Sequence, residues 1–178
     1  MRALADCPSN GIRCGNGESA QSRDCRFRPT EAVGRGRRSI CRKAGIGVSP
    51  DQKTLYVDET VGNCIKKFTI NADGSLSNRT NFALLNLLVK DKVESWWLGP
   101  DSMKIDSKGN IVVAQWSGGK ISKLSSDGEL LHVFEIAAGD GTTNVALCEG
   151  EKELYVTVVK DPNDSQARGS VVKILNVE

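Results

Sequence analysis

The sequence predicts an all-β protein: an irregular arm followed by about three four-stranded blades of a β-propeller. Three observations predict this. From residue 44 onward, short apolar runs alternate with turns rich in Gly, Asn, Asp and Ser. The alternation recurs three times, with about one propeller blade of chain in each copy. Residues 1–43 show neither this alternation nor a helical stripe.

The first copy begins at Gly45 and alternates strands with turns of recognisable chemistry. Pro50 suits a turn that needs its fixed φ, and Asn71–Gly74 ends in the Asp-Gly pair that tolerates positive φ in hairpins. A four-stranded antiparallel sheet accounts for this stretch. The expected strands cover 45–48, 54–57, 64–70 and 79–85.

The second and third copies repeat the pattern with strand centres at Val112 and Tyr155, equivalent to Tyr56 in the first copy. An insertion at 87–98, containing Trp96 and Trp97, separates the first two copies, and these aromatics suit loop packing better than a ligand shelf. We expect about twelve strands in three sheets. The later strands are expected near 103–106, 111–114, 120–124, 130–136, 145–147, 154–157 and 170–175.

The arm at residues 1–43 differs from the rest in charge. It carries ten basic and four acidic side chains, whereas residues 44–178 carry 14 and 18. Its basic run could contact phosphates or serve as a transit peptide, but without interleaved aromatics a solvated or unselected tail is the favoured interpretation. With a net charge of only +2 for the whole chain, no nucleic-acid partner is expected.

The arm also holds four of the six cysteines. No Cys-x2-4-Cys pair is present, so neither structural zinc nor, without a secretory signal, a disulfide framework is expected. No apolar run is long enough for a membrane span, so no membrane partner is expected and the location is cytoplasmic by default.

Three blades do not close a ring, since closed propellers use four to eight. Uncovered sheet faces would expose a large apolar patch. We therefore expect either self-association with another copy or a fragment of a larger propeller.

Several motifs of the repeat occur together. They include Gly45–Val57, Gly99-Pro100-Asp101, Trp116 with Gly118-Gly119, Asp127-Gly128-Glu129, and Thr142-Thr143-Asn144 with Leu154–Thr157. In order and spacing they resemble the C-terminal half of the gluconolactonase and senescence marker protein (regucalcin-like) family. The resemblance covers residues 44–178. It implies half of a six-bladed propeller, hydrolysis of sugar lactones or related esters, and one divalent cation, commonly calcium, in the central channel.

The resemblance transfers one site residue to this chain. Asp101 matches the Asp of the family's Pro-Asp-Gly motif, which implies that it is both metal ligand and general base, and Ser102 replaces the motif's Gly. The family's Asn ligand matches Ala44, which cannot coordinate a metal, and the family's N-terminal Glu has no counterpart. The implied ligand set is incomplete, so weak or absent activity is expected of this chain alone.

The repeat singles out Asp101 independently of the resemblance. Aligning Ile46, Met103 and Val145 places Ala44, Asp101 and Thr143 at one equivalent position, expected at the channel mouth. Only Asp101 is charged, and a carboxylate suits a hard cation such as calcium, which takes six to eight oxygen ligands. The alternative role for Asp101 is a turn residue that caps loop amides.

Other candidates are weaker. His132, the single histidine, lies in a strand-like run and suits a surface or packing position better than a catalytic base. Asp58 and Glu59 are expected to be a solvated pair at a strand end. Trp116 could line the channel or pack between blades.

Two functions stay open: a metal-dependent lactone hydrolase, or a non-catalytic propeller fragment that acts as a binding scaffold or is inert.

Overall fold

The computed structural model describes residues 43–88, 99–148 and 150–177, apart from the side chains of Lys43 and Leu87. These residues lie within one compact unit, Ile40–Glu178. The predicted irregular arm, with its four cysteines, and the Trp96-Trp97 pair lie outside the described residues.

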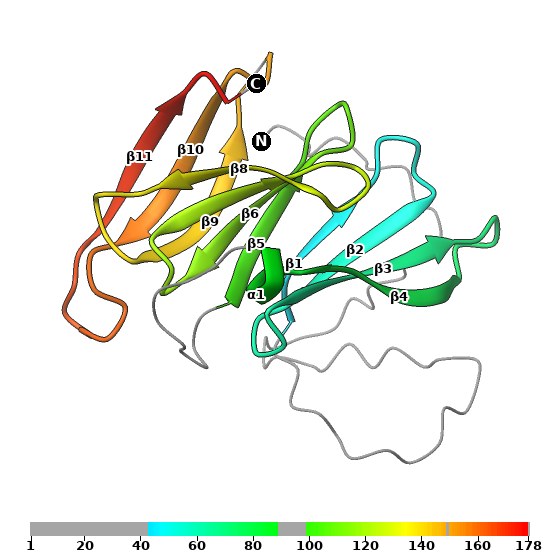
Figure 1. Ribbon diagram of the computed structural model, residues 1–178, viewed down its shortest axis with the longest axis horizontal. Helices are drawn as coiled ribbons and strands as arrows, with labels where there is room; N and C mark the ends of the chain where they lie inside the picture. The colour runs from blue at the N-terminus through cyan, green and yellow to red at the C-terminus, as the bar shows by residue number, and fades with distance from the viewer. Residues whose placement is uncertain (1–42, 89–98, 149, 178) are drawn as a thin grey trace, which may run out of the picture. The chain divides into compact units, whose positions relative to one another are not determined.

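The described chain forms three antiparallel sheets (Figure 1). Within each sheet the strands follow their order along the sequence, as expected when short turns join neighbouring strands. We call the sheets blades 1, 2 and 3. Blade 1 contains β1 (Lys43–Val48), β2 (Thr54–Glu59), β3 (Cys64–Ile70) and β4 (Leu76–Leu84); blade 2 contains β5 (Gly99–Ile105), β6 (Ile111–Trp116), β7 (Lys120–Leu124) and β8 (Leu130–Glu135); blade 3 contains β9 (Gly141–Leu147), β10 (Glu153–Val159) and β11 (Gly169–Leu175).

The turns form where the sequence predicts them. In the Pro50 turn, the Gln52 N–H donates to the Ser49 carbonyl at 2.9 Å. In the hairpin after β3, Gly74 has a φ of 80° and donates to the Asn71 carbonyl at 2.9 Å. A residue with a Cβ adopts this left-handed conformation only with strain, so the Asp-Gly pair fixes the position of this hairpin.

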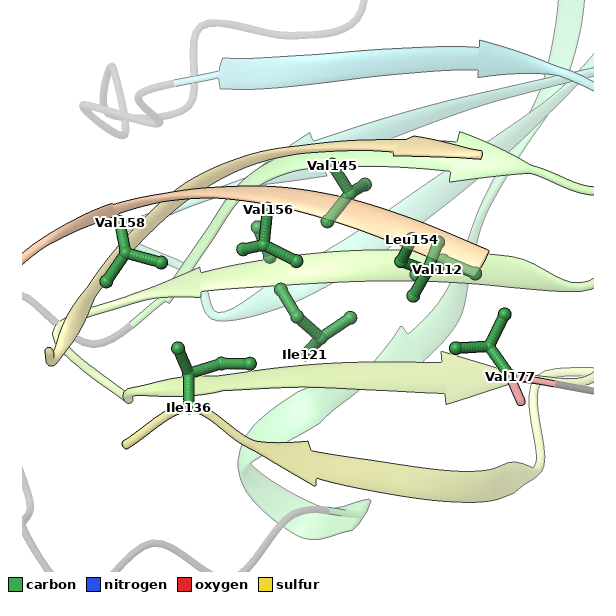
Figure 2. Packing of buried hydrophobic residues seen from close by; sticks show 9 residues of the cluster. Val112, Ile121, Ile136, Val145, Leu154, Val156, Val158 and Val177 are labelled. Carbon is green, nitrogen blue, oxygen red and sulfur yellow. The ribbon is translucent and has the colours of Figure 1, made fainter. Parts of the chain in front are cut away.

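The blades pack face to face through two apolar clusters. Tyr56 and Ile65 of blade 1 pack against Met103, Ile111 and Val113 of blade 2. The opposite face of blade 2 packs against blade 3 through a second cluster (Figure 2), whose members are mostly β-branched and therefore suit a pleated surface. Its buried members are Val112, Ala114, Ile121, Ile136, Val145, Leu154, Val156, Val158 and Val177.

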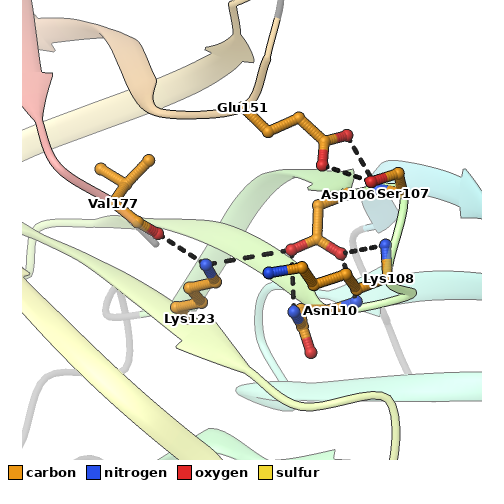
Figure 3. A network of polar contacts seen from close by, with 7 residues as sticks. All are labelled: Asp106, Ser107, Lys108, Asn110, Lys123, Glu151 and Val177. Atoms are coloured by element: carbon orange, nitrogen blue, oxygen red, sulfur yellow. Dashed lines mark hydrogen bonds and ion pairs between the residues drawn. The ribbon is translucent and has the colours of Figure 1, made fainter.

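Polar contacts join blades 2 and 3 at one end (Figure 3). Lys123 Nζ donates to the Val177 carbonyl at 2.6 Å and lies 3.9 Å from Asp106 Oδ2. Ser107 Oγ donates to Glu151 Oε2 at 2.6 Å. These contacts join the β9–β10 turn and the segment after β11 of blade 3 to the β5–β6 turn and to β7 of blade 2.

β1, β5 and β9 are the innermost strands: each begins its blade, and β5 lies beside both β1 and β9. Sheets that pack face to face around neighbouring first strands are the blades of a β-propeller, and the described residues form three of them. The all-β prediction is therefore confirmed.

The layout differs from the prediction in where some strands begin, in the number of strands and in one short helix. For example, β5 and β9 begin at Gly99 and Gly141, four residues earlier than expected. Eleven strands are present in the described residues, rather than about twelve, because blade 3 has no fourth strand there. A four-residue helix, α1 (Leu85–Leu88), begins at the predicted end of the fourth strand and extends into the predicted insertion at 87–98. No helix of the described chain is long and apolar enough to cross a membrane.

Candidate functional site

The three innermost strands share one irregularity. Each has a β-bulge near its start, where the pairing with the next strand shifts by one residue. The shift falls at Ala44 and Gly45 in β1, at Asp101 in β5 and at Thr143 in β9. The position that the sequence repeat aligns is thus a real structural equivalence, and bulges are the points where a strand redirects a side chain.

Asp101 lies on the bulge of the middle blade. Pro100 pairs with Gln115 and Ser102 pairs with Ala114, which leaves Asp101 without a partner in the ladder. The residue is partly buried. The strand β5 already includes Gly99 and Pro100, so Asp101 is a bulge residue within a strand rather than the loop-capping turn residue of the alternative interpretation.

Asp58 is a second carboxyl beside this position that sequence reasoning missed. It is fully buried, so the predicted solvated Asp58-Glu59 pair is wrong. Its Oδ1 accepts hydrogen bonds from the backbone N–H groups of Ala44 and Gly45 at 3.0 and 2.6 Å, whereas its buried Oδ2 has no hydrogen-bond partner. Asp58 opposes the Ala44 and Gly45 bulge on the neighbouring strand, which is the signal that could have found it.

Glu59 is buried for a different reason. Its Oε1 accepts a hydrogen bond from Arg79 Nη2 at 2.8 Å, and Lys66 Nζ lies 3.7 Å from its Oε2. The two cations offset the loss of solvation, so this carboxylate has a structural explanation that Asp58 lacks.

Both aspartates have a raised pKa. Burial raises the pKa of Asp101 above the ordinary value of a carboxyl, and the negative charge of Asp58 raises it further. Burial also raises the pKa of Asp58, against the two backbone N–H groups that lower it. A raised carboxyl pKa lies closer to neutral pH, where such a group exchanges protons with water more readily.

Polar side chains continue the site toward blade 3. Ser102 Oγ donates to Asn144 Oδ1 at 2.8 Å. Thr143 and Thr157 share a hydrogen bond of 2.6 Å between their hydroxyls. Along the innermost strands, the carboxylate of Asp101 is therefore followed, toward blade 3, by the hydroxyl of Ser102, the amide of Asn144 and the hydroxyl of Thr143.

This donor set does not complete a calcium site. The described residues contain no group of three His, Cys, Asp or Glu side chains that could hold a metal ion. Calcium takes six to eight oxygens, and Ala44 contributes a methyl group at the equivalent position of blade 1. Of the three equivalent bulge positions, only Asp101 fits as a carboxylate ligand of such a site.

The other sequence candidates lie elsewhere. His132 is exposed on β8, the outermost strand of blade 2, and its ring lies 4.4 Å from that of Phe134, so it has the predicted surface packing role. Trp116 is half-buried at the end of β6, and a Cβ added to Gly141 of blade 3 would lie 3.3 Å from its Cζ3. Trp116 therefore packs between blades.

Comparisons with known proteins agree with this architecture. The sequence model of the family described as SMP-30/Gluconolactonase/LRE-like region matches residues 12–160. The match starts before residue 43, where composition places the domain boundary. That boundary stays a prediction, because the arm lies outside the described residues.

Curated relatives are similar at modest identity. A pentonolactonase of Haloferax volcanii is 29% identical over 125 residues, which cover 69% of this chain and 40% of the relative. Regucalcin of Pongo abelii is 30% identical over 127 residues, which cover 68% of this chain and 39% of the relative. The chain thus spans about two fifths of the length of these relatives.

Solved structures show the same partial coverage. A luciferin-regenerating enzyme superposes with a TM-score of 0.62 at 26% identity, over 76% of this chain and 45% of that one. A gluconolactonase of Xanthomonas campestris gives a TM-score of 0.53 at 28% identity, over 67% and 35%. Regucalcin of Agrobacterium tumefaciens, at 24% identity and a TM-score of 0.56, shares the fold.

Proposed function

Because the chain belongs to the SMP-30/Gluconolactonase/LRE-like family, we propose that it is part of a hydrolase of sugar lactones or related esters. Relatives named as lactonases support the reaction class. The single observation that carries a role for this chain is the place of Asp101: a partly buried carboxyl on the innermost-strand bulge of the middle blade.

In this proposal Asp101 is the catalytic base. Opening a lactone needs a water molecule to attack the ring carbonyl, and a carboxylate that accepts a proton from that water makes it a better nucleophile. Without a bound cation, whose charge would lower it, the raised pKa suits this role, since a more basic carboxylate accepts a proton more readily. Asp58 raises that basicity through its charge without needing to touch the substrate.

Asp101 would also be one oxygen ligand of a divalent cation, which is calcium by family resemblance. When bound, such an ion supplies polarisation of the carbonyl. The described residues supply no group of three His, Cys, Asp or Glu side chains for this ion, so hydroxyl, amide, backbone or water oxygens, or residues outside the described ones, would have to complete the set. We therefore expect this chain alone to bind calcium weakly and to hydrolyse lactones weakly or not at all.

A cytoplasmic location remains a prediction from the sequence.

The alternative function is a non-catalytic propeller scaffold. Ala44 at an equivalent bulge position and the incomplete ligand set favour it. Lactone hydrolysis by the full chain with added calcium discriminates the two: turnover at ordinary enzyme rates of roughly 1–1000 per second would exclude the scaffold and contradict the expectation of weak activity.

The substitution Asp101→Asn tests the role of this residue. It keeps the shape but removes the charge that attracts a cation and the basicity that accepts a proton. We expect calcium affinity, measured by calorimetry, to fall and any hydrolysis to disappear, while metal-free stability changes by less than about 1 kcal/mol.

Asp127→Asn is the matched control for Asp101→Asn. It removes the same charge from an exposed turn residue and should change neither property. Unchanged calcium binding and hydrolysis in Asp101→Asn would assign Asp101 to the bulge geometry alone.

A further inference from the structure

Blades 1 and 3 each have an outer face, which is the sheet face that does not pack against blade 2. The equivalent sheet faces elsewhere in the molecule are buried between blades. Ile46 of β1 is equivalent to Met103 of β5 and Val145 of β9, because the three residues pair with equivalent residues of the next strand. Met103 and Val145 are 1% and 2% exposed, whereas Ile46 is 65% exposed. Blade 1 thus presents the kind of face that blades 2 and 3 each bury against the preceding blade.

Blade 3 presents the complementary kind of face. On the third strand of blade 3, Val171 pairs with Thr157 of the second strand. On the third strands of blades 1 and 2, Ile65 and Ile121 pair in the same way with Asp58 and Ala114. Val171, Ile65 and Ile121 therefore occupy equivalent positions in their blades. Ile65 and Ile121 are completely buried, whereas Val171 is 66% exposed. The surface beside Val171 is hollowed between β9, β10 and β11, which leaves room for side chains of another blade.

We propose that two copies of this chain close one propeller ring, with blade 3 of each copy packed on blade 1 of the other. The contact would place Ile46 of one copy against Val171 of its partner copy. This reproduces the two contacts inside the chain, where Met103 shares a cluster with Ile65, and Val145 shares a cluster with Ile121.

The charged side chains near these faces do not oppose such a contact. On blade 3, Lys173 Nζ lies 2.7 Å from Glu153 Oε1 and 5.9 Å from the centre of the Tyr155 ring. On blade 1, Lys66 is bound to Glu59 and Asn81. Each cation already has a partner within its own blade, so covering the faces leaves neither of these charges unpaired.

Symmetry makes a second copy a suitable occupant. A head-to-tail contact closes into a ring only when its rotation returns to the starting point. The described residues of two copies supply six blades between them, which is within the four to eight of closed propellers. The same contact then forms twice, and no apolar end face is left exposed.

Closure would also change the surroundings of Asp101. The innermost strands of both copies would line one channel, so two Asp101 carboxyls, on opposite blades, would face the same space. This consequence alone rests on the proposed function. The closure itself rests on the sheet faces and is tested without calcium or lactone.

The oligomeric state of the full chain tests the proposal. Sedimentation without calcium should give about twice the mass of the 19.2 kDa chain. Ile46→Lys and Val171→Asp should each give the single-chain mass, because each variant places a charge in the contact. Both residues are exposed in the single chain, so circular dichroism should show unchanged folding.

Mixing the two variants sharpens the test. A mixed pair has one unaltered contact and one contact in which the lysine introduced at position 46 of the first variant meets the aspartate introduced at position 171 of the second. Their opposite charges attract, so the doubled mass should return. Leu131→Lys, on an exposed residue of β8 outside both faces, is the control and should stay doubled.

Three results would overturn closure. A single-chain mass for the unaltered protein would mean that no second copy covers the faces, and would point to a preceding part of a longer protein as the occupant. Loss of pairing in only one variant would mean that one face pairs with itself. A mass above two copies would mean that the contact does not close.

Discussion

The two contacts between blades use equivalent backbone positions, and both contain an apolar cluster, but they differ in the polar groups beside that cluster. Between blades 1 and 2 the backbones approach so closely that a Cβ added to Gly99 would overlap the Thr60 carbonyl oxygen. That contact also holds the buried carboxyl of Asp58. Between blades 2 and 3, the residue equivalent to Asp58 is Ala114, and an apolar cluster with Thr142 hydroxyl bridges fills the space.

This difference teaches that the repeat fixes the backbone and leaves the chemistry to individual side chains. Each innermost strand forms its bulge whether the bulge residue is Ala, Asp or Thr. Only between blades 1 and 2, among the described residues, do two carboxyls come close enough for one to raise the pKa of the other. The candidate site is therefore a local departure from a repeated structure, and substitutions at equivalent positions should separate the two contacts.

The largest difference is expected between Gly99→Ala and Gly141→Ala. Both glycines precede the bulge residue by two positions, but the Cβ introduced at position 99 would overlap the Thr60 backbone, which cannot move without shifting a blade. At Gly141 the nearest atoms are Val159 Cβ at 3.0 Å and the Val159 carbonyl oxygen at 3.1 Å. We expect losses in the free energy of unfolding of about 3 kcal/mol or more and of about 1–2 kcal/mol, respectively.

Urea denaturation of both variants measures this difference. Equal losses would show that the two contacts tolerate added volume equally and would contradict the comparison.

The next largest effect is expected at Asp58. Asp58→Ala removes the acceptor of two backbone N–H groups, and we expect a loss of about 2 kcal/mol in the free energy of unfolding. Asp58→Asn keeps an acceptor oxygen and should lose less than about 1 kcal/mol. Urea denaturation at neutral pH checks both. A larger loss in the Asn variant would mean that the charge, rather than the hydrogen bonds, holds the bulge.

Thr142 tests the hydroxyl bridge of the other contact. Its buried Oγ1 donates to the Gln115 carbonyl at 2.6 Å and lies 3.1 Å from the Lys120 carbonyl oxygen. Thr142→Val keeps the volume and should lose about 1 kcal/mol in thermal unfolding. Thr143→Val, whose hydroxyl bonds lie at an exposed position, is the matched control and should lose less than about 0.5 kcal/mol. Equal losses would remove any special role for Thr142.

The smallest effect is expected at Ser102. Ser102→Ala removes the exposed hydrogen bond to Asn144 between blades 2 and 3 and should change the free energy of unfolding by less than about 0.5 kcal/mol. Urea denaturation measures it. A loss above about 1 kcal/mol would show that the polar side chains beside Asp101 stabilise the contact as much as the apolar cluster does.

Much of the fold was predictable because its signals are local. The alternation around Tyr56, Val112 and Tyr155 located the second strand of each blade, and the Pro50 and Gly74 turns located hairpins. The start of β4 differs from the prediction. This strand begins at Leu76 rather than near Arg79, because Ser77 and Asn78 after Leu76 are polar and the pairing of this stretch with β3 is irregular.

The sequence by itself determined the threefold repeat and the single charged residue, Asp101, among three equivalent positions. Tertiary structure alone decided that these positions are bulges, because a bulge is a property of pairing between strands. It also decided that Asp58 is buried. Burial depends on the neighbouring blade, which meets the Asp58 region at Gly45 and Ser102, residues that are far apart in the chain but joined across one contact between blades.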